Sequence, residues 1–448
     1  AAATNQFAYA EGDATYLSRA DGFANYAEAT AAPAEEAYVM DDATRKEVEA
    51  NSTAYYDSTA YDNAEDTMPT LGSDNGLTLA DLTGKAYDDP MWDQLLDQMS
   101  FEDMSLLVNL GGWQTAQIDS VGKVATSDCD GPAGVNNFIT GTYGTPYPTE
   151  VLMAQTWNTD LLYDLGLAMG QEYADVNNYG VYGPAMNTHR SAFAGRNFEY
   201  YSEDGVLAGK LAAAQVNAMA TKGTYNYIKH FAFNDQENHR GDRDGQFSVA
   251  TWFNEQSARE IYLKPFEMCM KLGDVELNYL EQKSDGTYEN ATRQIRACQA
   301  VMTAFNRIGY TWTGGSYNLL TGIARNEWAF NGMMITDNAN TGVFMDGYQM
   351  IEAGGDIKLT YLADSARFDF DKNDTATYHY AREAMHRVLY TVANSKAMLG
   401  AMPGTDFVDE PSDTEKITMA VDIVCGILIA LLAVTTVLRF VPRRKKQK

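Results

Sequence analysis

Short apolar runs alternate with longer amphipathic stretches between residue 88 and about residue 399. The apolar runs predict strands at residues 122–128, 179–187, 225–234, 301–306, 332–337 and 356–360. The amphipathic stretches predict helices at residues 91–99, 160–175, 205–222, 255–272, 317–328 and 375–398. Such alternation is typical of a parallel sheet covered by helices. Because about 310 residues hold six or more of these units, the pattern favours an α/β fold of the (β/α)8 TIM-like barrel type over an open sheet.

Polar and charged side chains follow the predicted strands where each strand ends. These residues are Asp128 and Asp130, Asn187 with His189 and Arg190, Lys229 with His230, Asn306 with Arg307, and Asp337. In a barrel the C-terminal strand ends face one mouth, which is where active sites form. Five such ends predict a convergent polar site there.

Residues 417–438 are almost wholly apolar, apart from Asp422 near the outer end. As a helix this segment spans roughly 33 Å, which is enough for the hydrocarbon core of a membrane. Basic residues follow at once: Arg439, Arg443, Arg444, Lys445 and Lys446. Positive charge beside a span favours the cytoplasmic side, so we expect the barrel to be extracellular. The alternative interpretation is a buried core helix.

The first 86 residues are acidic, rich in Ala, Asp, Glu, Asn and Tyr, and show little periodicity. We interpret them as an extended linker that wraps over a neighbouring domain, with plain disorder as the alternative. The chain starts Ala-Ala-Ala without a Met or a signal peptide, so we expect it to be the later part of a longer precursor.

Composition removes several function classes. Sixty-one acidic against 33 basic residues give a net charge of −28, which argues against a nucleic-acid partner. The chain lacks the CxxC, HExxH, GxGxxG, GxxxxGK[ST] and GxSxG motifs, and its four Cys are scattered. His189, His230 and His239 are too widely spaced for zinc, so no metal or cofactor is expected.

The predicted mouth is rich in carboxylates, cations and amides, which are the groups that bracket sugar hydroxyls. A glycoside also needs a carboxylate close to its anomeric carbon. Aromatic residues make up 12% of the chain and include six Trp, which could stack on sugar faces. Core packing remains the alternative for each Trp.

Four motifs occur in order: DGPAG at 130–134, GRNFEYYSED at 195–204, KHFAFNDQENHR at 229–240 and GMMITD at 332–337. With these motifs the chain resembles glycoside hydrolase family 3, the β-glucosidase family, over roughly residues 88–400. The resemblance implies a catalytic barrel and a retaining hydrolysis of terminal β-linked sugars, of the β-glucosidase or β-xylosidase type, through a covalent glycosyl-enzyme intermediate.

The resemblance also implies roles for single residues. Asp337 matches the nucleophile, and Asp130 matches the carboxylate that holds distal sugar hydroxyls. The matching basic groups, which bind hydroxyls and orient the acids, are Arg196, Lys229, His230 and Arg240. Because nearby cations lower the pKa of a carboxylate, we expect Asp337 to stay ionised at neutral pH.

Two positions depart from the family pattern. Phe305 stands in the Ala-Phe-Asn turn where the family often has Tyr, so a hydroxyl near Asp337 is missing and another group must supply its hydrogen bond. Asn338 follows the nucleophile where Trp is common, which changes the expected wall of the sugar pocket.

A retaining mechanism needs a second carboxyl group about 5–5.5 Å from the first. In two-domain members it sits on an α/β sandwich domain, for which this chain has no room. In a single-domain branch a His on a Lys-His-Phe-Pro-Gly-His-type loop acts instead, and the corresponding loop here, residues 229–234, differs. We therefore expect the barrel part of a membrane-anchored member with reversed domain order, whose acid/base comes from an upstream segment or another chain.

The expected organisation has five segments: a linker at 1–86, the barrel at 87–400, a polar stalk at 401–416, a transmembrane helix at 417–438 and a basic cytoplasmic tail at 439–448. The expected partners are a glycoside or oligosaccharide, the cell membrane and the possible sandwich domain. Two other functions stay open. One is a non-catalytic carbohydrate-binding or sensing protein on a degenerate barrel, and the other is a membrane-tethered structural subunit.

Overall fold

The computed structural model describes residues 62–399, with the exception of 239, 241–247, 284, 341–343 and 361–370. It also describes the helix at 413–440 and short pieces of residues 5–59. The chain forms two compact units, Ala1–Thr405 and Asp406–Lys448. Of the predicted stalk at 401–416 and the predicted tail at 439–448, residues 401–412 and 441–448 lie outside the described residues.

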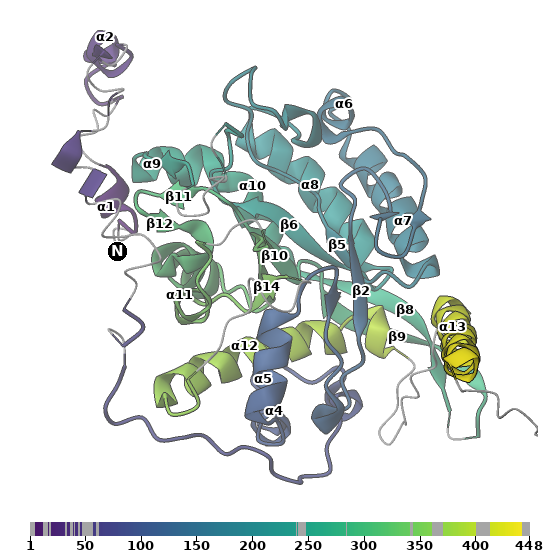
Figure 1. Ribbon diagram of the computed structural model, residues 1–448. Helices are drawn as coiled ribbons and strands as arrows, with labels where there is room; N and C mark the ends of the chain where they lie inside the picture. The colour runs from purple at the N-terminus through teal and green to yellow at the C-terminus, as the bar shows by residue number, and fades with distance from the viewer. Residues whose placement is uncertain are drawn as a thin grey trace, which may run out of the picture. The chain divides into compact units, whose positions relative to one another are not determined.

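The larger unit is built on a mixed sheet that is drawn in Figure 1. Its described strands follow the order β14-β13-β10-β6-β5-β2-β3-β4, and β1 pairs with β2. Six of them run parallel: β2 (Thr126–Asp130), β5 (Gly180–Tyr182), β6 (Tyr225–Phe231), β10 (Ala300–Thr303), β13 (Met333–Asn338) and β14 (Ile357–Leu359). The antiparallel additions are β1 (Gln114–Thr115), β3 (Asn136–Asn137) and β4 (Thr142–Tyr143).

Each of the six apolar runs overlaps one parallel strand, because these strands are buried on both faces. Along β13, for example, Met333 and Ile335 belong to one apolar cluster and Met334 to another. The first cluster also holds Trp92 from α4 (Met91–Leu96) and Val388 from α12 (Thr375–Ala393). The second lies against α8 (Gly205–Ala220) and α10 (Lys264–Met270), where it includes Leu211 and other buried residues.

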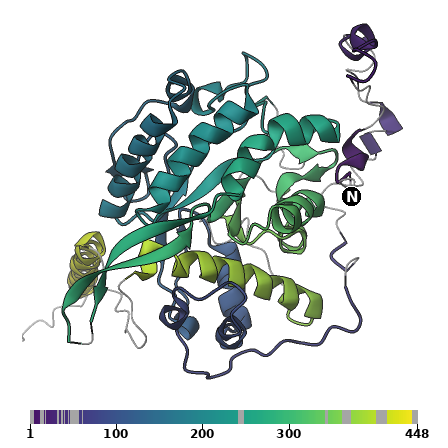
Figure 2. The same cartoon turned by 180° about the vertical axis from the view of Figure 1, so that it is seen from behind.

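Helices follow the strands as the alternation predicts. Their bounds are α4 (Met91–Leu96), α5 (Phe101–Asn109), α6 (Glu150–Ala154), α7 (Thr159–Asp175), α8 (Gly205–Ala220), α9 (Glu255–Ser257), α10 (Lys264–Met270), α11 (Gly347–Ala353) and α12 (Thr375–Ala393). Two segments are π-helical, Ala258–Tyr262 and Asn318–Glu327. Helix α7 packs on α8, and α8 packs on α10, so these three helices lie side by side (Figures 1 and 2).

The two outer parallel strands, β14 and β2, are linked through the segment between α5 and β1. The N–H groups of Gly111 and Gly112 donate to the carbonyls of Lys358 (3.1 Å) and Thr360 (2.9 Å). The N–H of Asp128 in turn donates to the carbonyl of Trp113 (2.9 Å). The sheet is therefore curled, with one extended segment bridging its outer parallel strands.

The described sheet has fewer parallel strands than the expected eight-unit barrel. The described residues contain six parallel strands in a mixed, curled sheet, and the predicted count of eight is not reached among them. Two of these six strands, β5 and β14, are only three residues long.

Two features have no counterpart among the predicted elements. A hairpin of β8 (Asp274–Gln282) and β9 (Tyr288–Arg296) connects α10 to β10. A small sheet of β7 (Ala250–Thr251), β11 (Arg307–Ile308) and β12 (Thr311–Trp312) follows the C-terminal ends of β6 and β10. In the N-terminal region the structure describes α1 (Ala8–Glu11), α2 (Tyr26–Ala29) and a 3₁₀ turn at Leu79–Leu82.

The second unit contains one long helix, α13 (Asp413–Phe440). Its stretch Lys416–Arg439 has a mean hydropathy of 2.6 and no buried residues. Among the described residues it is the helix that is long and apolar enough to cross a membrane, judged by length and composition.

Candidate active site

The predicted site residues lie at or just beyond the C-terminal ends of the parallel strands. Asp130 ends β2, Lys229 and His230 lie near the end of β6, and Asp337 lies near the end of β13. The remaining three come from the loops that follow β5, β6 and β10: Arg196, Arg240 and Phe305. Parallel pairing puts all of these ends at one edge of the sheet.

Asp337 is mostly buried, with 13% of its side chain exposed. Its Oδ2 lies 3.8 Å from Nε2 of His230. Its Oδ1 accepts a 2.7 Å hydrogen bond from the backbone N–H of Asn338. This neighbouring amide therefore supplies a hydrogen bond to the carboxylate at a site where Phe305 has no hydroxyl to offer.

Arg196 and Arg240 are tied together by one carboxylate, Glu237. Nε of Arg240 lies 3.0 Å from Oε2 of Glu237, and Nε of Arg196 lies 3.9 Å from Oε1. Arg196 also donates to Glu199. The guanidinium of Arg240 stands 4.7 Å from the centroid of the Phe305 ring, in a cation–π contact with the aromatic face.

Lys229 is only 4% exposed. Within the described residues its ammonium makes no hydrogen bond or ion pair, although its charge acts on both Asp337 and His230. The ammonium is not one of the fully buried atoms that lack a partner, so it is open to an oxygen-rich ligand.

Asp130 is held separately from this group. Its Oδ2 accepts a 3.0 Å hydrogen bond from the indole N–H of Trp113, and its backbone carbonyl accepts one from Tyr173. Strands β5, β6 and β10 separate β2 from β13 in the sheet order. In the described part of the chain no hydrogen bond or ion pair joins Asp130 to the other predicted site residues.

The expected lowering of the Asp337 pKa is wrong in direction, whereas its ionisation at neutral pH stays a prediction. Burial raises the pKa of Asp337 above its ordinary value, and the charges of Arg196, Arg240 and Lys229, together with the Asn338 N–H, only oppose the rise. Burial, together with the same cations, pushes the pKa of His230 well below its usual value. His230 is therefore a neutral imidazole near neutral pH, and its contact with Asp337 is not an ion pair.

The region that carries this geometry matches a known protein family. Residues 124–361, more than half of the chain, match the Glycosyl hydrolase family 3 N terminal domain. The chain belongs to glycosyl hydrolase family 3. The matched region contains all seven predicted site residues, from Asp130 to Asp337.

Curated relatives within the family carry β-glucosidase names. The chain is 35% identical over 275 residues to Beta-glucosidase A of Butyrivibrio fibrisolvens, which is 60% of this chain and 29% of the relative. It is 32% identical over 260 residues to Probable beta-glucosidase I of Aspergillus clavatus, covering 58% and 27%. The matched part thus spans less than a third of the length of these relatives.

Solved structures show the same fold. Beta-glucosidase 3B from Thermotoga neapolitana, in complex with α-D-glucose, superposes with a TM-score of 0.54 at 27% identity, over 68% of this chain and 43% of that one. A β-glucosidase from Paenibacillus barengoltzii superposes with a TM-score of 0.60 at 24% identity, over 81% and 38%. The second likeness concerns the fold alone.

Sequence reasoning missed two members of the site. Glu237 was not singled out, although its i, i+3 spacing from Arg240 inside the third motif is a usable signal for an ion pair. Trp113 precedes β1 in a stretch without periodicity, and nothing in the sequence indicates its hydrogen bond to Asp130. In the described residues no group of three or more His, Cys, Asp or Glu is placed to hold a metal.

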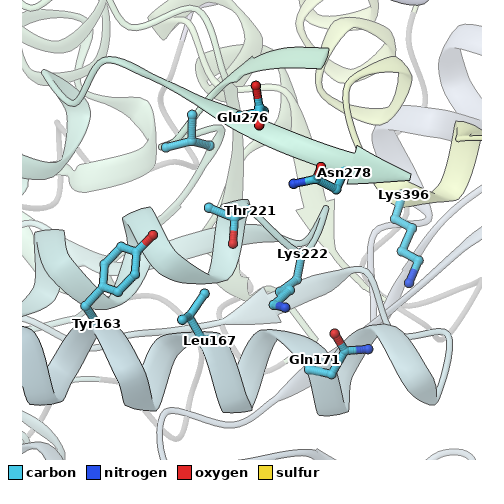
Figure 3. A pocket seen from close by; sticks show the side chains of 9 residues that line it. Tyr163, Leu167, Gln171, Thr221, Lys222, Glu276, Asn278 and Lys396 are labelled. Carbon is cyan, nitrogen blue, oxygen red and sulfur yellow. The ribbon is translucent and has the colours of Figure 1, made fainter. Parts of the chain in front are cut away.

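A hollow of about 610 Å³ lies away from this edge of the sheet (Figure 3). Thr221 and Lys222 line it and come directly before β6, so the hollow is at the N-terminal strand ends. Its other walls are α7, the strand β8 and Lys396. None of the seven predicted site residues lines it, and it is not the candidate sugar site.

Proposed function

We propose that the chain is the catalytic part of a retaining glycoside hydrolase that cleaves terminal β-linked sugars, of the β-glucosidase or β-xylosidase type. The observation that carries this proposal is the Asp337 carboxyl group, which lies at the C-terminal strand edge beside neutral His230 and within the field of three cations. The β-glucosidase names of the relatives favour a glucoside as substrate.

Each side chain then has a part in binding. The ammonium of Lys229 and the guanidinium groups of Arg196 and Arg240 donate charged hydrogen bonds to sugar hydroxyls. The Asp130 carboxylate, oriented by Trp113, accepts hydrogen bonds from the distal hydroxyls of the same ring. Donors that tighten on the 2-hydroxyl in the transition state would contribute several kcal/mol, on the order found in other glycosidases.

The covalent step uses the carboxylate form of Asp337. Its oxygen bonds to the anomeric carbon while the glycosidic C–O bond breaks, and the leaving oxygen takes the bonding electrons and needs a proton. Water then bonds to the same carbon and gives its proton to the outside acid/base, while the bond to Asp337 breaks and the carboxylate is regenerated. Because burial raises the pKa of Asp337, this carboxylate form is lost at a higher pH than that of an ordinary Asp.

We propose that the proton donor comes from outside this chain. Two carboxyl groups close to the site, Glu199 and Glu237, are ion-paired with Arg196 and Arg240 and are therefore already engaged. A sandwich domain on an upstream segment or a separate chain is the source we propose.

Mechanism-based labelling tests the nucleophile. We expect 2,4-dinitrophenyl 2-deoxy-2-fluoro-β-D-glucopyranoside to add one fluoroglucosyl group to the chain, on the peptide that contains Asp337. Asp337→Asn should abolish the label, and Asp285→Asn, an exposed aspartate in the β8–β9 turn, should not. Binding of glucose with no label in the wild type would instead favour the non-catalytic sugar-binding function.

A leaving-group series tests the outside proton donor. For the chain alone, the rate should fall steeply from dinitrophenyl to methylphenyl glucosides, because the poorer leaving groups need protonation. Azide should accelerate release of the sugar and yield β-glucosyl azide. Efficient hydrolysis of cellobiose by the 448-residue chain alone would contradict the proposal.

We also propose that α13 anchors the protein in the cell membrane as a single span. The helix is apolar over Lys416–Arg439, and basic residues cluster after it, which favours a cytoplasmic C-terminus and an extracellular catalytic unit. A protease added to intact cells should remove the catalytic unit and leave an epitope tag at residue 448 protected. Protection of the catalytic unit would contradict this topology.

A further inference from the structure

We propose that residues 5–11 act as a strap that holds the sugar-binding loop after β6 in its working conformation, with Phe7 as a positioning residue. The strap lies outside the region that the family domain matches, more than two hundred positions before the loop. It includes α1, which lies beside the small sheet of β7, β11 and β12 (Figures 1 and 2).

The side chain of Phe7 is fully buried, unlike those of Phe23 and Tyr26, which are exposed. Its ring meets Phe233 edge-on at a centroid distance of 5.9 Å and Phe253 at 5.2 Å. Burying a Phe side chain contributes on the order of 2 kcal/mol, and the edge-to-face contacts add to this. Phe7 is thus seated in an aromatic socket on the catalytic unit.

Polar contacts fix the rest of the strap to the connection between β7 and α9. The backbone N–H of Phe253 donates to the carbonyl of Ala10 at 3.3 Å, and the N–H of Glu255 donates to Oε1 of Glu11 at 3.2 Å. Within the strap, Oδ1 of Asn5 accepts from the Phe7 N–H at 2.8 Å, and its amide donates to Glu11 at 2.9 Å. The Ala10–Glu11 end of the strap is therefore held on the catalytic unit, and the Asn5 contacts tie the other end back to it.

The socket belongs to the loop that carries the sugar-binding groups. Phe233 follows Lys229 and His230 by a few residues and stacks on Phe253 at 4.1 Å. Phe233 has φ of +66°, a left-handed conformation that costs a bulky residue about 1–3 kcal/mol unless its surroundings hold it. The rings of Phe7 and Phe253, which both contact the Phe233 ring and each other, provide that hold.

From Phe233 the coupling continues into the site through hydrogen bonds. The side-chain amide of Asn234 donates to the Tyr200 hydroxyl at 2.8 Å and to Oε1 of Glu237 at 2.9 Å. Tyr200 in turn lies 3.3 Å from Nδ1 of His230, and Glu237 holds both Arg196 and Arg240. Release of the strap would loosen Phe233, which precedes Asn234 in the chain and so adjoins this hydrogen-bond network.

The test compares Phe7→Ala with Phe23→Ala in the full chain, since Phe23 is 45% exposed and makes a matched control. Hydrogen exchange of the backbone in residues 229–238 is the first readout, and it does not depend on enzyme activity. We expect Phe7→Ala to speed exchange there by about tenfold or more, and Phe23→Ala to leave it unchanged. Uniformly faster exchange over the whole catalytic unit would overturn the strap, because Phe7 would then be a general core residue.

The second readout rests on the proposed function and uses a dinitrophenyl glucoside. We expect Phe7→Ala to raise KM and lower kcat/KM by about tenfold to a hundredfold, with Phe7→Leu in between. A deletion of residues 1–12 should show the same loss, and a synthetic peptide of residues 1–12 should reverse it. Unchanged exchange and unchanged KM in Phe7→Ala would overturn the proposal, whereas a wild type with no activity would count against the proposed function alone.

Discussion

Nε2 of His230 lies 3.8 Å from Oδ2 of Asp337, and the imidazole carries no charge at neutral pH. Burial and three neighbouring cations lower the pKa of His230, so the ring meets the carboxyl group as a neutral polar neighbour. The Tyr200 hydroxyl at 3.3 Å from Nδ1 sets the orientation of the ring. Through this pair a site residue near the end of β6 contacts a site residue near the end of β13.

The neutrality of His230 gives the first prediction. His230→Ala should lower kcat for an activated aryl glucoside by about tenfold to a hundredfold, because Asp337 loses an orienting neighbour. An unperturbed His titrates at about pH 6.5, so the wild-type pH–rate profile should show no inflection near that pH. An inflection near pH 6.5 that disappears in His230→Ala would contradict this account.

The second prediction concerns the acidic limb of the pH profile. Because burial raises the pKa of Asp337, activity should be lost as pH falls through a value above the usual one for Asp. Arg196 is the strongest of the charges that oppose this rise, so Arg196→Gln should move the limb to higher pH. The position of the acidic limb is measured from the rate of fluoroglucoside labelling as a function of pH.

Lys85→Gln is the control for that experiment, since this lysine is exposed and pairs with Asp89 away from the strand ends. Its profile should coincide with the wild-type profile. A limb that moves to lower pH in Arg196→Gln would show that the Arg196 charge does not act on Asp337.

The third prediction tests the bridge between β14 and β2. A Cβ on Gly111 would lie 2.1 Å from Cγ2 of Ile357 and 2.6 Å from the carbonyl oxygen of Lys358. Gly111→Ala should therefore separate the segment from β14 and lower the melting temperature by several degrees, as a loss of about 1–3 kcal/mol does. Gly273→Ala is the matched control, because nothing lies within 4 Å of the place that its methyl group would take. Equal melting temperatures would mean that this close approach does not stabilise the fold.

The strand positions and the family motifs could be predicted because both depend on local sequence. A strand buried on both faces must be apolar throughout, and all six apolar runs overlap one. Among the charged residues at the strand ends, His230 and Asp337 do meet, at 3.8 Å, whereas Asp130 makes no hydrogen bond or ion pair with them in the described residues.

Other features depend on information that the sequence does not carry locally. The hairpin β8–β9 was missed because its alternation is short: Val275 and Leu277 are buried between exposed polar residues at the start of β8, but β9 is exposed over most of its length. The direction of the Asp337 pKa shift could not be predicted because the sequence shows the cations but not the burial that outweighs them. Phe7 is a single aromatic residue in an acidic stretch, and only its contacts with Phe233 and Phe253 distinguish it from its neighbours.

The last prediction concerns Glu150, a fully buried carboxyl group at the start of α6. Neither of its oxygens has a hydrogen-bond partner among the described residues, and burial raises its pKa well above the ordinary value. The folded protein therefore holds the proton while the unfolded chain releases it above about pH 4.5. The stability contribution is full below that pH and declines by about 1.4 kcal/mol per pH unit as pH rises toward the folded-state pKa.

Glu150→Gln cannot ionise, so its melting temperature relative to wild type should rise between pH 5 and pH 8. Glu276→Gln, an exposed carboxylate on β8, should show a constant difference over the same range. A Glu150→Gln difference that is flat or falls with pH would mean that Glu150 is ionised in the folded protein.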